Sequence, residues 1–134
     1  MTPFKENKEL SIKVTVWTKD SSGINNYMYL VQGIGWSMYV DIYPTMNCQV
    51  SSIGAFNDLL RRDDILPILK WLRKEGIIVK PQLLIDVNSA SNYTYVDKIK
   101  SIFKPEHIVF EQQYTSTNNS IMTMMLLKTN WLLD

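Results

Sequence analysis

The chain has 134 residues, 46% of them hydrophobic and 20% charged, and its formal net charge is +1. This balance is typical of a single folded domain and excludes wholesale disorder. The chain also has no dense run of Lys and Arg, which argues against a broad nucleic-acid-binding surface. Cys48 and His107 are the only cysteine and histidine, which excludes an internal disulfide and any metal site built from several such side chains.

The N-terminal stretch MTPFKENKEL is charged and lacks the apolar centre of a signal peptide. No apolar run approaches the roughly 20 residues that a membrane-spanning helix needs. These features predict a cytoplasmic protein with no membrane partner, folded as one domain over residues 1–134.

The first half of the chain carries the pattern of strands. Apolar residues alternate with polar ones from Leu10 to Trp17, which is the period of a half-buried strand. Two further strands are predicted from Tyr27 to Gln32 and from Trp36 to Tyr43, where Pro44 ends the run. Short links between them predict an antiparallel meander.

A polar loop is predicted after Pro44, followed by a helix from Ile53. Asp64 is a suitable N-cap for a second helical segment, and Gly76 a suitable residue to end it. One face of the first helix would carry Ile53, Phe56, Leu59 and Leu60.

The second half alternates strands with a helix. Pro81–Val87 (PQLLIDV) predicts a buried strand, and Asn92 to Phe103 a helix. IVFEQQYT, from Ile108, has one largely polar face, whereas Ser120–Lys128 (SIMTMMLLK) is apolar on both faces. This difference predicts an outer strand beside an inner one. The predicted fold is α+β, with a mixed, mostly antiparallel sheet and flanking helices.

This order of elements resembles the C-terminal two-thirds of the GNAT family of N-acetyltransferases, over roughly Leu10 to Lys128. In that family a strand leads into a loop of pattern Q/R-x-x-G-x-G/A, and a later segment often reads V-N-x-x-N. The stretch of this chain that contains Asn88 and Asn92 resembles the V-N-x-x-N segment. The loop pattern is matched here by Gln49, Val50, Ser51, Ser52, Ile53 and Gly54.

The resemblance implies that these residues bind acetyl-CoA or another acyl-CoA. Glycine lets the backbone approach a phosphate, and successive N–H groups at the start of a helix attract an anion. The resemblance also implies a tyrosine that protonates the departing thiolate, for which Tyr93 and Tyr95 are candidates. Asp41, between apolar neighbours on the third strand, is the candidate base for the amine proton. The acceptor would be a small-molecule or peptide amine.

A second hypothesis is a non-catalytic interaction module of the same fold, with a protein partner or a second copy of itself. Ser52 stands where the family has its first glycine, and Ile99 stands where counting from Asn92 would place the family's tyrosine. No counterpart of the family's first strand and two helices precedes Leu10. Under this hypothesis Gln49–Gly54 is a polar loop that caps a helix through Ser51 or Ser52.

Overall fold

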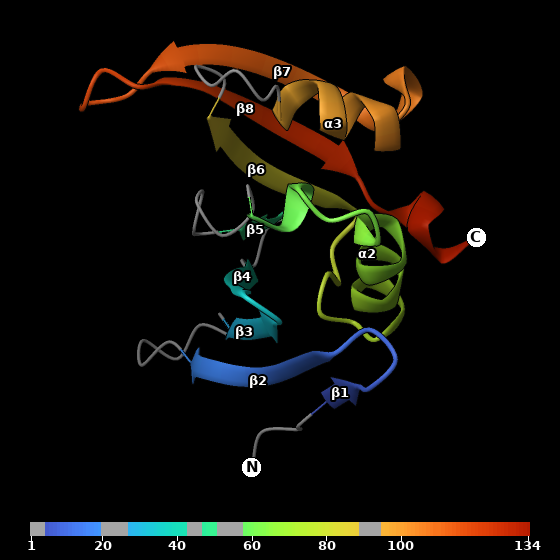
Figure 1. Ribbon diagram of the computed structural model, residues 1–134. Coiled ribbons are helices and arrows are strands. Elements are labelled where there is room, and N and C mark those ends of the chain that lie inside the picture. The colour runs from blue at the N-terminus through green and yellow to red at the C-terminus, as the bar shows by residue number, and fades with distance from the viewer. Residues whose placement is uncertain (1–4, 20–26, 43–46, 51–57, 89–94) are drawn as a thin grey trace.

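Eight strands form one sheet, in the order β1-β2-β3-β4-β5-β6-β8-β7. The computed structural model describes residues 5–19, 27–42, 47–50, 58–88 and 95–134 (Figure 1). The predicted α+β class and the mostly antiparallel sheet are confirmed. The strands are β1 Lys5–Asn7, β2 Ile12–Lys19, β3 Tyr27–Gly33, β4 Trp36–Ile42, β5 Asn47–Val50, β6 Gln82–Asn88, β7 Ile108–Thr115 and β8 Ile121–Lys128.

The predicted meander of β2, β3 and β4 is confirmed, with antiparallel pairing throughout. β2 begins at Ile12, later than the predicted Leu10, because Leu10 lies in the turn that follows β1. Ser11 has a positive φ of 57° in this turn. β1 was not predicted, since its sequence Lys-Glu-Asn has no apolar alternation.

The prediction of a polar loop after Pro44 is wrong for Asn47–Val50, which form β5. β5 pairs antiparallel with β4 and parallel with β6. Cys48 is fully buried, opposite Ile42 on one side and Leu83 on the other. Packing between two apolar strands therefore makes a strand of a segment that has little strand pattern of its own.

The helices are α2 Ile65–Lys74 and α3 Tyr95–Ile102, with 3-10 turns at Pro105–His107 (η1) and Asn130–Leu133 (η2), and residues 58–60 are also helical. α2 begins after Asp64 and is followed by Gly76, as predicted. Gly76 has φ of 77°, the left-handed conformation that commonly ends a helix. The Asp64 carboxylate accepts a hydrogen bond from Arg62 Nε at 2.9 Å instead of capping α2.

β8 lies between β6 and β7, which confirms the predicted inner position of the last strand. It pairs antiparallel with both neighbours. Met122 and Leu126 are buried on one face, and Met125 and Leu127 on the other. The outer strand β7 is mostly exposed, as its polar face predicted.

The hydrophobic core lies on one face of the sheet. Buried residues of α2 and α3, including Leu69 and Ile99, pack there against Val40 of β4 and Leu83 of β6, and both helices lie on the same side of the twisted sheet (Figure 1). None of the described helices packs on the opposite face, which we call the open face. It carries Leu30, Tyr39, Asp41, Gln49, Leu84, Asp86, Phe110, Gln112, Tyr114 and Leu126. Within the described residues, no helix is long and apolar enough to cross a membrane.

Candidate functional site

The parallel strands β5 and β6 separate partway along β6. Their pairing ends with Gln49 opposite Leu84, whereas β6 continues to Asn88. Among the described strands, only β8 pairs with β6 beyond Leu84. β5 ends at Val50, which pairs with Val40 of β4. We call residues 85–87 the β6 edge. In the described part of the chain, no strand pairs with this edge on the β5 side.

Three of the predicted site residues lie on the open face beside this edge. Asp41 is directly opposite Gln49, and Asn88 lies on the same face at the end of β6. Asp41 is half-buried, and burial raises the pKa of its carboxyl group above 3.8. The fold therefore places a carboxyl group with a raised pKa one strand away from the separation of β5 and β6.

Val50 belongs to β5 rather than to a loop. The other residues of the predicted loop and helix start lie outside the described residues: Ser51, Ser52, Ile53, Gly54, Asn92 and Tyr93.

Tyr95 lies on the helix-bearing side of the sheet. It begins α3 and is only 3% exposed, within the main core. Its hydroxyl accepts hydrogen bonds from Arg61 Nε at 3.0 Å and Nη2 at 2.5 Å. The structure therefore does not bring Tyr95 together with Asp41, whose side chain is on the open face.

Asp86 and Tyr114 form a polar pair on the open face that the sequence analysis did not single out. The Tyr114 hydroxyl donates to Asp86 Oδ1 at 3.0 Å, reaching from β7 across β8 to β6. Burial raises the pKa of Tyr114 above 10.0, and the adjacent Asp86 carboxylate raises it further. The sequence predicted the strand that carries Asp86, but finding its partner required the strand order.

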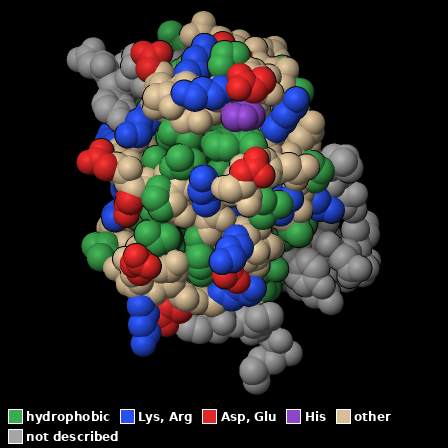
Figure 2. Space-filling model, turned by 90° about the vertical axis from the view of Figure 1, so that its right-hand side faces the viewer, with side chains coloured by type: hydrophobic (Ala, Val, Ile, Leu, Met, Phe, Trp, Pro, Cys, Tyr) green, Lys and Arg blue, Asp and Glu red, His purple; other side chains and the backbone are tan. Residues whose placement is uncertain are grey.

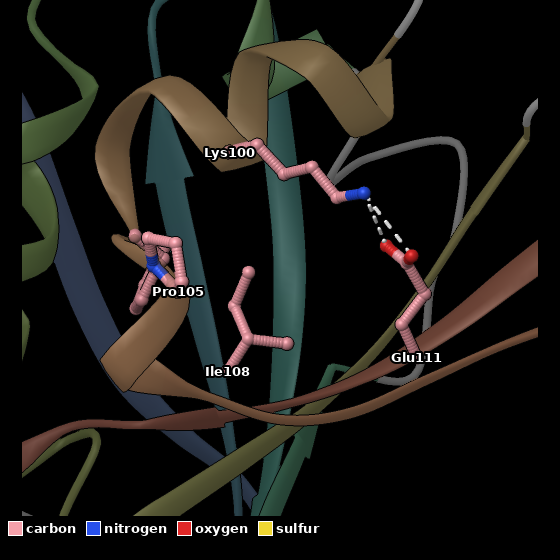
Figure 3. A pocket seen from close by; sticks show the side chains of 5 residues that line it. Lys100, Pro105, Ile108 and Glu111 are labelled. Carbon is pink, nitrogen blue, oxygen red and sulfur yellow. Dashed lines mark hydrogen bonds and ion pairs between the residues drawn. The ribbon is translucent and has the colours of Figure 1, made fainter.

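A hollow on the helix-bearing side lies between α3 and β7, with a volume of about 320 Å³. Lys100 and Glu111 point toward one another across it, while Pro105 and Ile108 line its other side (Figure 3). Lys100 Nζ lies 3.1 Å from Glu111 Oε1 and 3.0 Å from Oε2. Because these charges neutralise each other, the hollow offers no uncompensated charge to a ligand.

A second groove, of about 470 Å³, runs between α2, η2 and the turn after β1. Trp71 and Leu133 are among its apolar residues, and Lys70 Nζ donates to the backbone oxygen of Asp134 at 3.4 Å. On this side of the molecule, apolar side chains reach the surface between basic and acidic ones (Figure 2). The groove thus has neither a dominant charge nor a deep apolar cavity.

The described residues contain no group of three or more His, Cys, Asp or Glu side chains placed to bind a metal ion. A scan against protein-family models and searches of curated proteins and of solved structures gave no match. The geometry of the β6 edge and the open face must therefore carry the functional argument.

Proposed function

We propose that this chain is a small acyl-CoA-binding protein of the N-acetyltransferase type, which transfers an acyl group to an amine. The observation that supports it is the separation of the parallel strands β5 and β6 after Gln49 and Leu84. A strand edge with which no described strand pairs, as at residues 85–87, offers backbone N–H and C=O groups to an extended chain. The pantetheine arm of CoA is an extended chain with amide groups, so its chemistry fits the β6 edge.

The ligand would contact segments that come together around this separation. The predicted contact segment Gln49–Gly54 begins within β5 and would hold the pyrophosphate. Backbone groups of the β6 edge would pair with the pantetheine amides. Asn88, at the end of β6, belongs to the predicted second contact segment.

In the proposed reaction, the acyl-CoA supplies the acyl group as a thioester. The amine nitrogen forms a bond to the acyl carbon, the carbon–sulfur bond breaks, the nitrogen loses a proton and the thiolate gains one. Asp41 would take the amine proton, because its raised pKa makes it a better base than an exposed carboxylate. Tyr93 would supply the proton to the thiolate, since Tyr95 is buried in the core on the face of the sheet opposite Asp41.

Calorimetric titration with CoA and acetyl-CoA, joined to amide hydrogen exchange, tests this proposal. We expect saturable binding that slows exchange at residues 85–87, because the ligand would cover the β6 edge. Exchange in β1, at the far end of the sheet, should not change. Binding without protection of the β6 edge would place the ligand elsewhere, and absence of binding would refute the proposal.

Two bulky substitutions supply matched variants. Gly54→Trp changes the last position of the predicted loop pattern and should abolish CoA binding. Gln32→Trp changes an exposed residue on the open face of β3 and should leave binding intact. Asp41→Asn should retain CoA binding but lose acyl transfer, which separates the proposed base from the binding site.

A non-catalytic interaction module, with a protein partner or as a homodimer, is the second candidate. It is favoured by the open face, where Tyr39, Leu84 and Met124 are only half-buried and no described helix covers them. Replacing Leu84 by Lys discriminates between the candidates when assayed for both CoA binding and association. Association that Leu84→Lys abolishes, in a chain whose wild-type form binds no CoA, would support the interaction module alone.

A further inference from the structure

The two ends of the sheet differ in how far they are protected against pairing with another strand. β1, at one end, has only three residues, and Lys5–Asn7 is mostly polar. β7, at the other end, has eight residues, and within the described chain only β8 pairs with it. Short or strongly charged edge strands resist association, whereas long uncovered ones invite it.

The side chains of β7 are suited to an interface. Phe110, Gln112 and Tyr114 lie on the open face, and Phe110 is 40% exposed. Glu111 carries the only charge on the strand, and Lys100 of the same chain already neutralises it. The irregularity in β7 lies between Ile108 and Phe110, so the pairing with β8 is regular from there to the end of the strand.

We infer that β7 pairs antiparallel with β7 of a second copy of this chain, with the two-fold axis at Gln112. In a continuous antiparallel sheet, opposed residues lie on the same face, so the axis must pass through a residue position. With the axis at Gln112, Phe110 lies opposite Tyr114 of the second copy, and Glu111 lies opposite its Gln113. The facing Gln112 side chains each carry a donor and an acceptor and can bond to each other.

Charge and aromatic pairing select this register over its neighbours. With the axis at Glu111, the two Glu111 carboxylates would face each other, and like charges directly opposite are destabilising. With the axis at Gln113, Phe110 would face Ser116, beyond the end of β7. Of these three registers, only the one at Gln112 has an aromatic cross-strand pair and no like charges opposite each other within β7.

The interface would lie on the side of β7 opposite the polar pair of the open face. Tyr114 reaches from β7 across β8 to Asp86, away from the second copy. Association would therefore leave this pair in place and join the open faces of both copies into one surface. This inference does not depend on acyl-CoA binding, since β6, β8 and β7 lie in that order and the β6 edge faces β5.

Charged side chains at position 112, on the proposed two-fold axis, provide the decisive test. Gln112→Glu and Gln112→Lys should each weaken the dimer on the order of fivefold at low salt, because identical charges would face each other. An equimolar mixture of the two variants should recover the affinity as a heterodimer, measured by sedimentation equilibrium and native mass spectrometry. Gln32→Glu and Gln32→Lys, at an exposed position of β3, should leave association unchanged.

Cross-linking gives a second measurement. Opposed residues in an antiparallel pair have Cα atoms about 4.5–5.5 Å apart, within the disulfide range of about 4.4–6.8 Å. Oxidised Gln112→Cys protein should therefore form a covalent dimer, whereas Gln32→Cys protein should not. Cys48 is fully buried and does not compete. A monomeric wild-type chain, a dimer insensitive to charge at position 112, or pairing of β7 only with other proteins would each overturn the inference.

Discussion

The hydroxyl of Tyr114 donates a hydrogen bond to the carboxylate of Asp86, and the pKa of this hydroxyl can be measured directly. Burial is the main cause of the raised pKa of Tyr114, and the adjacent carboxylate adds to it through the hydrogen bond and its charge. The fold therefore favours the neutral phenol. Its contribution to stability is complete below about pH 10.0 and is lost as the pH rises through the raised pKa.

We predict that Asp86→Asn lowers the pKa of Tyr114 part of the way back toward 10.0. The substitution removes the negative charge that opposes phenolate formation but retains an oxygen that accepts the hydrogen bond. NMR titration of labelled tyrosine measures the shift, with Tyr114→Phe identifying the resonance. An unchanged pKa would mean that burial alone controls this hydroxyl.

Asp41 yields a second prediction at this scale. Its raised pKa means that the folded state binds the proton more tightly than the unfolded state, so stability falls as the pH rises through the folded pKa. Asp41→Asn should therefore increase the free energy of unfolding at pH 7 by less than about 1 kcal/mol, since water still screens this half-exposed group. Urea denaturation at pH 7 and near 3.8 measures the effect, which should shrink at the lower pH. A loss of stability at pH 7 would show that the carboxylate makes favourable contacts.

At the scale of elements, the β3–β4 hairpin depends on two glycines for different reasons. Gly33 lies opposite Trp36, and a Cβ at this position would overlap the indole ring. Trp36 is only 7% exposed, so the ring has little room to move. Gly35 has open space around it but a φ of 77° that disfavours any side chain.

Gly33→Ala is predicted to cost about 1–3 kcal/mol of stability through overpacking. Gly35→Ala should cost about 1 kcal/mol, from backbone strain alone. Denaturant unfolding of both variants measures these costs, and tryptophan fluorescence should change only for Gly33→Ala. Equal costs with unchanged fluorescence would contradict the packing of Trp36 over Gly33.

At the scale of the whole molecule, the core is assembled on one side of the sheet around the central strand β5. Cys48 is fully buried there, and burial raises the pKa of its thiol. Burial and the raised pKa both protect Cys48 from reagents that react with the thiolate. The rate at which Cys48 reacts therefore reports how often β5 opens to solvent.

We predict that Cys48 is labelled by thiol reagents only through global unfolding. The free energy from labelling should equal that from urea denaturation, in the range of about 5–15 kcal/mol usual for domains. Faster labelling would reveal local opening of β5. In that case CoA, if it binds beside β5 as proposed, should slow the reaction.

The sequence by itself determined the features that follow from periodic patterns. Alternation predicted the meander of β2, β3 and β4, and apolar residues on both faces placed β8 inside the sheet, because a strand with neighbours on both sides buries both faces. The end of α2 was equally readable, since Gly76 acts through local backbone geometry, whereas Asp64 precedes α2 without capping it through its side chain. Each of these signals depends on residues close together in the chain.

The tertiary structure alone decided the features that depend on distant neighbours. Asn47–Val50 became β5 because β4 and β6 bury Cys48 between them. Asp86 contacts Tyr114 because only β8 lies between their strands and the tyrosine side chain reaches across it. Tyr95 was separated from Asp41 because α3 packs on the face opposite the one Asp41 occupies. Contacts of this kind arise from strand order and register, which a local pattern of residues does not encode.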